Sequence, residues 1–154
     1  MIDPSLEHIF SITVVIDPPQ GIGPAPDGLR LIFPIVSGEV AGPRMRGKVL
    51  PGGGDWFTCR RDGVGILDVR DTIETDDGAL IYMFYTGVTD LGEDGYEKAL
   101  RGELPSVLQL RTTPRFQTGH PAYAWLNRLQ CIGIGTAEVG AGGNKVSYEV
   151  YAIR

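Results

Sequence analysis

Cysteine and histidine are scarce in this sequence, and the few that occur are far apart. The chain of 154 residues contains two cysteines, Cys59 and Cys131, and two histidines, His8 and His120. The cysteines form no C-x-x-C pair, so a metal site built from cysteine and histidine is not expected, although carboxylates could still form one. Isolated cysteines are typically small, buried side chains in proteins of a reducing compartment. We therefore expect no metal ion.

Long apolar runs and positive charge are also lacking. The sequence contains no run of about 18 apolar residues, and its first residues, Met-Ile-Asp-Pro-Ser, do not form a signal peptide. We accordingly expect no membrane partner and a cytoplasmic protein. Lysine and arginine total 14 against 19 acidic residues, which gives a formal net charge of −5. Because phosphate binding requires a basic surface, a nucleic acid partner is not expected.

Motifs for common cofactors and nucleophiles are missing as well. Gly21-Ile22-Gly23 and Gly133-Ile134-Gly135 lack the third glycine and the following helix of a dinucleotide-binding fingerprint. Ser37 and Ser106 do not lie in the G-x-S-x-G elbow of serine hydrolases. We therefore expect neither a cofactor nor serine hydrolase chemistry.

Glycine and proline, by contrast, are abundant, with 22 and 11 residues, and they separate many short apolar runs. This distribution indicates turns between strands. The predicted strands cover residues 6–16, 29–36, 39–50, 56–59, 64–70, 79–86, 107–112, 125–134 and 146–153. Residues 21–28 are predicted to form a loop, and Pro34 should lie at a sheet edge or a bulge because it cannot donate a ladder hydrogen bond. One short helix is predicted over Leu91–Gly102, where Tyr96 and Leu100 fall at helical spacing.

Short strands that recur roughly every 8 to 12 residues favour an antiparallel barrel or sandwich. The single predicted helix is too little for a parallel α/β fold. A closed barrel leaves no unpaired sheet edge and provides a cavity at one mouth. We expect an all-β protein, an antiparallel β-barrel with one short helix, as a single domain over residues 1–154.

Arginines occur within several of the apolar strands. Polar groups among apolar neighbours either face solvent or are buried and paired. One interpretation places Arg70, Arg111 and Arg128 outside the sheet, or in structural pairs with Asp55 and Asp68. In the other interpretation some of these arginine side chains point into the barrel lumen, where aromatic residues complete an apolar pocket with few polar groups. The aromatic residues in question are Tyr82, Tyr85, Tyr123 and Trp125.

A glycine-rich bend in the stretch Gly42–Trp56 introduces a second group of polar residues. Two arginines, Arg44 and Arg46, precede the bend, and Asp55 and Trp56 follow it. The glycines permit positive φ and a close approach of two backbones. In one interpretation Asp55 caps backbone N–H groups and Trp56 anchors the core. In the other, Asp55 is a general acid or base whose pKa is raised by burial.

Three segments resemble a known family: GPRMRGKVLPGGGDW, RRDGVGILDVRDTIETDDGALIYMFYTG and LRTTPRFQTGHPAYAWLNRLQCIGIG. Their order and length are similar to those of the bacterial and fungal family called domain of unknown function 3237, or UPF0311. The resemblance extends over Leu6–Arg154 and implies a calycin-like antiparallel β-barrel. It implies little about activity, because the family is mostly uncharacterised. One departure is Gln109-Leu110, which replaces an expected aromatic pair and would change the ligand if that pair lines the pocket.

These features favour a cofactor-independent enzyme that acts on a small hydrophobic or aromatic carbonyl compound by acid–base proton transfer, as a hydratase or lyase, an isomerase or a cyclase. An oxygen that gains charge would be stabilised by hydrogen-bond donors, and an arginine would orient an anionic group or tune the acid. The candidate catalytic residues are Asp55, Tyr85 and Arg70. The candidate ligand-binding residues are Arg44, Trp56, Tyr82, Arg111, Tyr123, Trp125 and Asn127. The alternative is a non-catalytic binding or carrier barrel that uses the same lumen.

The last predicted strand suggests assembly. It alternates Val146, Tyr148, Val150 and Ala152 with Ser147, Glu149, Tyr151 and Ile153. A barrel wall needs only one apolar face, so Tyr151 and Ile153 are left to cover something outside. A homodimer would bury them, and two-fold dimers are the commonest oligomers. The alternative is that the predicted helix packs there instead.

Overall fold

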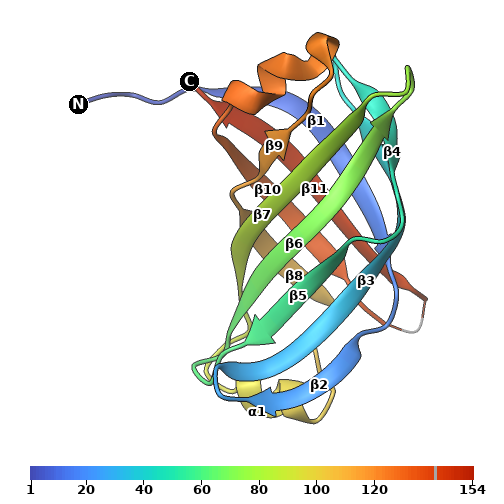
Figure 1. Cartoon of the computed structure of the whole chain (residues 1–154). Coiled ribbons are helices and arrows are strands. Elements are labelled where there is room, and N and C mark those ends of the chain that lie inside the picture. The colour runs from blue at the N-terminus through green and yellow to red at the C-terminus, as the bar shows by residue number, and fades with distance from the viewer. Residues whose placement is uncertain (141) are drawn as a thin grey trace.

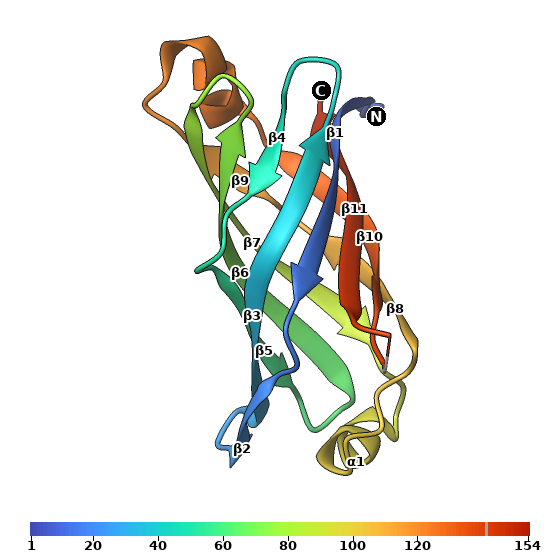
Figure 2. The same cartoon turned by 90° about the vertical axis from the view of Figure 1, so that its right-hand side faces the viewer.

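The computed structural model describes residues 1–140 and 142–154. The described residues form an 11-stranded antiparallel sheet that closes into a barrel (Figures 1 and 2). Around the barrel the strands pair in the order β6-β5-β3-β1-β11-β10-β8-β7, and β7 pairs again with β6. The strands are β1 Leu6–Ile16, β2 Gln20–Ala25, β3 Gly28–Ala41, β4 Arg46–Val49, β5 Gly54–Cys59, β6 Val64–Thr75, β7 Leu80–Asp90, β8 Val107–Thr112, β9 Arg115–Gln117, β10 Cys131–Glu138 and β11 Asn144–Ile153.

Two places in the wall are each shared by two short strands. Between β3 and β6, β5 pairs with Leu29–Pro34 of β3, and β4 continues the wall along residues 38–41. On β7, β8 pairs with Gly87 and Val88, whereas β9 pairs with residues 82–84. Pro114 separates β8 from β9, and proline has no N–H for a ladder bond. The wall is therefore interrupted before Gly54 and again at Thr113–Pro114.

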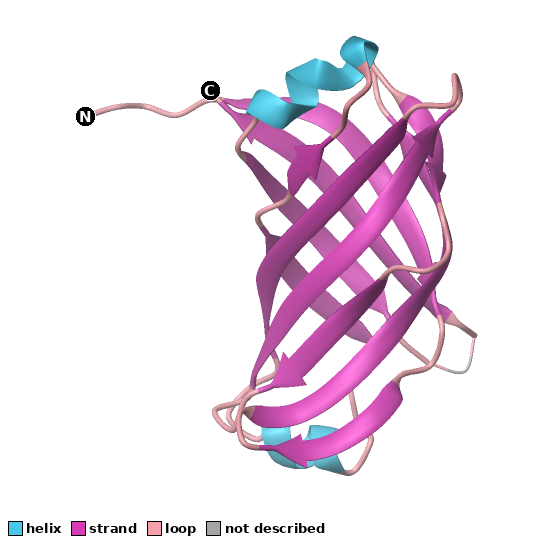
Figure 3. Ribbon diagram, in the orientation of Figure 1, coloured by secondary structure: helices cyan, strands magenta, loops and turns pink. Residues whose placement is uncertain are grey.

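The two helices lie at opposite ends of the barrel (Figure 3). The 3₁₀ helix η1, Pro121–Arg128, covers the end where the β3–β4 and β6–β7 turns lie, and the α-helix α1, Gly95–Leu100, lies at the other end (Figure 1). Neither has the length and the apolar character that a bilayer span would require. The side chain of Asn127 holds η1 in place by bonding the N–H and the C=O of Thr118, both at 2.9 Å.

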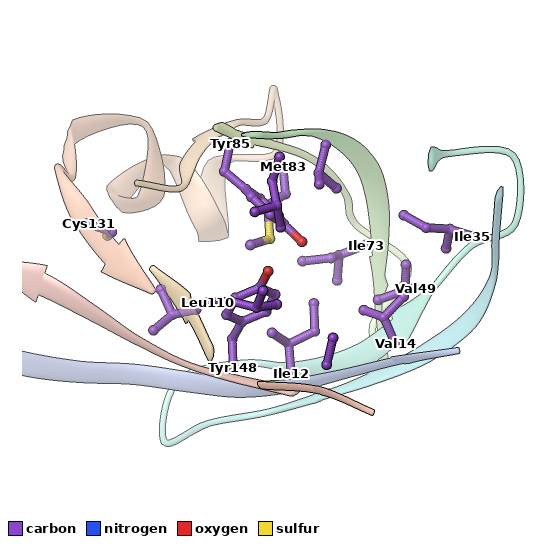
Figure 4. Close-up of a cluster of buried hydrophobic side chains, with 14 of the residues drawn as sticks. Ile12, Val14, Ile35, Val49, Ile73, Met83, Tyr85, Leu110, Cys131 and Tyr148 are labelled. Atoms are coloured by element: carbon purple, nitrogen blue, oxygen red, sulfur yellow. The ribbon is translucent and has the colours of Figure 1, made fainter. Parts of the chain in front are cut away.

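The barrel interior is filled with side chains from alternate strand positions. Residues of β6 and β7 such as Val69, Ile73 and Met83 are buried, and their outward neighbours are more exposed. Figure 4 shows Ile73 and Met83 facing side chains of the opposite wall, including Ile12 and Leu110. The antiparallel barrel with one short α-helix that the sequence predicts is thus confirmed.

Several predicted boundaries are wrong, each for a local reason. Gly28–Ala41 forms one strand, because the irregularity between the two predicted strands is a register shift in the β1–β3 pairing, where Val15 pairs with Ser37 and Ile16 with Ile35, rather than a chain break. Most of the expected loop over residues 21–28 pairs with β3 as β2. The α-helix is shorter than predicted, because Gly92 and Gly102, with φ of +85° and +72°, bracket it. The glycine-rich turn after β10 includes Ala141, which lies outside the described residues.

The predicted strand over residues 125–134 is wrong in its first half. Pro121 begins η1, and the ring of His120 accepts the N–H of Ala122 at 3.3 Å as a cap. Proline suits the first turn of a helix because its fixed φ is helical and its missing N–H would be unpaired there. The strand β10 therefore begins only at Cys131, and the side chains of residues 123–128 do not alternate between two faces of a sheet.

The helix α1 does not cover the outer face of β11. It packs near β3 and β5 instead, so the interpretation in which it shields Tyr151 and Ile153 is wrong. Tyr148, Val150 and Ala152 point into the core as predicted, and Ile153 remains 42% exposed. A homodimer through this face stays a prediction.

Candidate functional site

A buried carboxyl group lies in the middle of the β6 wall. Alternation along this strand turns Val69, Asp71 and Ile73 inward, and Asp71 is only 2% exposed. Within the described part of the chain, neither oxygen of this carboxylate has a hydrogen-bond partner. Burial raises the pKa of Asp71 to about 7. At neutral pH this group is therefore close to half ionised inside the barrel.

A second carboxyl group, that of Asp55, faces the same lumen from β5. Its Oδ1 accepts the backbone N–H of Asp68 at 3.0 Å. Although part of the residue reaches solvent, protein surrounds the carboxyl group, and this burial raises its pKa to about 7. The hydrogen bond from Asp68 and the charge of Arg30 lower that pKa, and the charge of Asp68 adds to the increase. Burial outweighs the lowering effects.

The glycines before Asp55 explain how β5 comes so close to β6. Gly52 has a φ of +107°, which side-chain-bearing residues rarely adopt. A Cβ atom on Gly53 would lie 2.3 Å from the carbonyl oxygen of Arg70 and 3.1 Å from Cα of Asp71. Only a glycine at this position lets the bend pack directly against the backbone next to Asp71.

Two tyrosines from different walls complete the polar cluster. The rings of Tyr85 on β7 and Tyr148 on β11 meet edge to face, with centroids 5.5 Å apart. Figure 4 shows their hydroxyl groups pointing toward one another in the lumen. Burial raises the pKa of both phenols, and the charges of Asp71 and Asp55 raise it further. Both are neutral at physiological pH and so can donate a hydrogen bond, and the hydroxyl of Tyr148 has no partner among the described residues.

The glycines of β10 make room for one of these rings. A Cβ atom on Gly135 would lie 2.3 Å from Cδ1 of Tyr148, and one on Gly133 would lie 2.3 Å from Oγ1 of Thr112. The Gly133-Ile134-Gly135 sequence, which does not match a nucleotide fingerprint, thus has a packing role. It forms a shallow inner surface on which the ring of Tyr148 lies.

A small cavity of about 30 Å³ lies at the centre of this cluster. It is lined by Val14, Ile16, Ile35, Asp55, Leu67, Val69, Tyr85, Val146 and Tyr148. A space of this size accommodates a water molecule. Ile16, Asp55 and Val146 are the partly exposed residues of this lining, so they mark where the cavity approaches solvent.

Of the candidate residues predicted from the sequence, the structure places Asp55 and Tyr85 in the lumen together. The interpretation in which Arg70, Tyr82 and Arg111 also point into the lumen is wrong, because inward neighbours such as Val69 and Met83 turn them to the outer face. Nη1 of Arg70 lies 3.2 Å from Oδ1 of Asp68, which agrees with the interpretation that the two residues form a structural pair. Its guanidinium lies 5.5 Å from the ring of Trp56, which is 36% exposed on the same face.

The other four candidates gather at the barrel end that η1 covers. The guanidinium of Arg44 lies 3.7 Å from the ring centroid of Trp125, which packs against the core. The hydroxyl of Tyr123 donates to Asp77 in the β6–β7 turn at 2.7 Å. Asn127 holds Thr118 as described above. These contacts fasten η1 to the two neighbouring turns, and none of the four side chains lines the central cavity.

Sequence reasoning missed two members of the cluster, Asp71 and Tyr148. Alternation could have found both: Asp71 interrupts the inward row Leu67, Val69 and Ile73, and Tyr148 lies in the row that was assigned to the interior. Within residues 1–140 and 142–154, no group of three or more His, Cys, Asp or Glu side chains is arranged to hold a metal ion.

Comparison with known proteins places this barrel in a family. A family model described as "Protein of unknown function (DUF3237)" matches residues 4–153. The UPF0311 protein RPA1785 of Rhodopseudomonas palustris is 39% identical over 138 residues, which cover 87% of this chain and 89% of that protein. The crystal structure of a protein with unknown function from Clostridium acetobutylicum matches with a TM-score of 0.87 and 34% identity, over 99% of this chain and 100% of the other.

A more distant likeness shows that the same fold occurs in a protein described as an enzyme. That crystal structure, from Penicillium herquei, has a TM-score of 0.68 and 20% identity, over 100% of this chain and 97% of the other. At this identity the likeness concerns the fold alone. The family match, the relatives and the barrel agree, and the chain belongs to the DUF3237 family, some of whose members are named UPF0311 proteins.

Proposed function

We propose that this protein is a cofactor-independent enzyme that transfers a proton on a small hydrophobic carbonyl compound bound in the barrel lumen. One observation carries the proposal: Asp55 and Asp71, on adjacent strands, both have a pKa of about 7 next to two neutral phenols. General acids and bases work best when their pKa lies near the operating pH. Strongly shifted carboxyl groups gather at functional sites more often than elsewhere.

The proposed roles follow from which polar groups face the lumen: Asp55, Tyr85 and Tyr148 line the central cavity, and Asp71 faces the same lumen two residues beyond Val69 on β6. The carboxylate of Asp55 removes a proton from the carbon next to the carbonyl group. Tyr85 and Tyr148 donate hydrogen bonds to the carbonyl oxygen as it gains negative charge. The protonated carboxyl of Asp71 returns a proton to a second carbon or to a leaving oxygen, which corresponds to isomerisation or to elimination of water. The rate should be highest near pH 7, where one carboxyl can be ionised while the other is protonated.

Substrate binding requires the lumen to widen. A space of about 30 Å³ is too small for a carbonyl compound of several carbon atoms. Ile16 and Val146 are the partly exposed apolar members of the lining, so we expect these two side chains to separate when substrate enters. The resemblance in fold to a protein described as an enzyme is compatible with catalysis in such a barrel.

The non-catalytic alternative is supported by the mainly aliphatic lining of the cavity, which suits an apolar ligand. One experiment separates the two functions. The protein is incubated in D₂O with a panel of hydrophobic ketones and aldehydes, and deuterium incorporation next to the carbonyl group is followed by NMR, with ligand binding measured in parallel. The variants are Asp55→Asn, Asp71→Asn and Tyr85→Phe, and the matched control is Asp27→Asn in the exposed β2–β3 turn.

If the protein is an enzyme, deuterium should be incorporated next to the carbonyl group faster in its presence than in buffer alone. Asp55→Asn should slow this exchange by at least about 100-fold, because Asp55 removes the proton, and the control should not. Asp71→Asn should leave this exchange in place and slow the later isomerisation or loss of water. Binding without exchange would identify a carrier. Exchange that survives both Asp55→Asn and Tyr85→Phe unchanged would show that the assignment of these residues is wrong.

A further inference from the structure

The outer wall of the barrel carries a second concave surface, away from the lumen. It lies where β7 changes partner from β8 to β9, and it has a volume of about 270 Å³. We call it the outer groove and define it by Arg70, Tyr82, Phe84, Thr86, Thr113 and Arg115. Val69 and Tyr85 border both this groove and the central cavity, so a single layer of β6 and β7 separates the two.

The break in the wall creates this hollow. Pro114 is fully buried between β8 and β9, and the N–H of Thr113 donates a hydrogen bond to the carbonyl of Thr86 on β7 at 3.1 Å. The chain therefore departs from β7 and returns to it at Arg115. The outward side chains of β7 line the hollow that is left between them.

Aromatic surface forms the floor of the outer groove. Tyr82 and Phe84 point outward from β7, and their rings stack with centroids 5.0 Å apart and an angle of 23° between the planes. Tyr82 is 37% exposed, although an outer wall in water would normally carry polar side chains here. Such an aromatic surface favours contact with another flat ring.

Positive charge lies at the edge of this floor. The guanidinium of Arg115 is 6.0 Å from the ring of Phe84 and forms no ion pair with any carboxylate in the described residues. Arg70, by contrast, is paired with Asp68, the acidic side chain that borders the groove. Arg115 is one of several arginines without an ion pair in the described residues, and it borders the outer groove. Its flat fork of donors is suited to a carboxylate.

We propose that the outer groove binds a planar aromatic carboxylate. The face of the ligand ring lies across the edges of the stacked Tyr82 and Phe84 rings, in an edge-to-face contact, and its carboxylate accepts two hydrogen bonds from Arg115. A hollow of about 420 Å³ that also contains Tyr82, with Gln117 and Asn127, continues the groove toward η1 and leaves room for a longer ligand. The six side chains that define the outer groove point away from the cavity, whereas Tyr85, a proposed lumen donor, borders both spaces, so the test below includes a lumen variant.

The test uses 2-naphthoate as the probe and 2-naphthamide as its neutral counterpart, with isothermal titration calorimetry on the full chain. Naphthoate should bind more tightly than naphthamide. Arg115→Gln should weaken naphthoate binding about tenfold, as expected for the loss of a charged hydrogen-bond donor, and Tyr82→Ala should weaken both probes. Arg46→Gln, an exposed arginine on β4, is the matched control, and Asp71→Asn reports on the lumen.

Arg46→Gln and Asp71→Asn should both bind naphthoate as tightly as the unmodified chain does. All substitutions in the groove and in the control are on the surface, and circular dichroism verifies that each variant is folded. The proposal is overturned if naphthoate shows no binding at millimolar concentration, if the two probes bind equally, or if Arg115→Gln has no effect. Loss of binding in Asp71→Asn would place the probe in the lumen and would overturn it as well.

Discussion

The unpaired carboxyl of Asp71 should make the stability of this protein depend on pH in an unusual direction. Most carboxyl groups in folded proteins are stabilised in their ionised form, so stability is lost as pH falls. Burial of Asp71 has the opposite effect, because it raises the pKa from 3.8 to about 7. The folded state holds its proton more tightly than the unfolded state does. The free energy of unfolding should therefore decrease as pH rises from about 4 to about 7, and level off above that.

The size of this effect follows from the shift. A change from 3.8 to about 7 is roughly three pKa units, and each unit corresponds to 1.36 kcal/mol, so ionised Asp71 destabilises the fold by about 4 kcal/mol. Water that enters the neighbouring cavity of about 30 Å³ would solvate the charge, which makes this value an upper bound. A destabilisation of about 4 kcal/mol is a large fraction of the free energy of unfolding of a typical domain.

The Asp71→Asn variant isolates this contribution, because the amide has nearly the shape of the carboxyl and does not ionise. Near pH 4 the variant and the unmodified chain should differ by no more than about 1 kcal/mol, since both side chains are then neutral and poorly paired. At pH 8 the variant should be more stable by several kcal/mol. Urea unfolding at pH 4, 6 and 8 measures the difference, with Asp27→Asn in an exposed turn as the control. A stability difference that does not change with pH would refute the reasoning.

Three further substitutions, one of them with a control substitution, and one measurement on the unmodified chain test other parts of the structure. Gly135→Ala should destabilise the fold by about 1–3 kcal/mol in a urea titration, because the new methyl group would lie 2.3 Å from the ring of Tyr148. Gly119→Ala is its control: a methyl group there meets nothing within 4 Å, so stability should change by less than about 0.5 kcal/mol. Tyr148→Phe should leave thermal stability unchanged or raise it, since the hydroxyl it removes has no partner among the described residues; a loss above about 1 kcal/mol would indicate a hydrogen bond that the structure does not contain. Asn127→Ala should lower the free energy of unfolding by about 1–2 kcal/mol, because its two hydrogen bonds to Thr118 are lost. The backbone amide hydrogens of η1 should also exchange faster with solvent. Unchanged exchange there would mean that other contacts hold this helix. Light scattering at micromolar concentration should give the mass of a dimer, and a monomer mass that does not change on dilution would exclude the predicted assembly.

The fold class could be predicted from the sequence because its signals are local. Alternation of side chains has a period of two along any strand, so Tyr148, Val150 and Ala152 could be assigned to one face without knowledge of their partners. Glycine and proline mark turns through their own backbone preferences, and these also hold in the unfolded chain. The predicted strand over residues 125–134 is wrong in its first half because two local signals conflict there: aromatic residues such as Trp125 favour a strand, whereas Pro121 begins a helical turn.

The candidate site, in contrast, depended on closure of the barrel. Alternation shows that Asp68 and Arg70 share one face of β6 and that Val69 and Asp71 share the other, but both faces also contain apolar residues. Which face lies inside is decided by the pairing of β6 with β5 and β7, and by the strands that complete the ring. The same closure brings carboxyl groups from β5 and β6 next to tyrosines from β7 and β11. Their raised pKa values arise from burial by all of these walls together, so only the tertiary structure could reveal them.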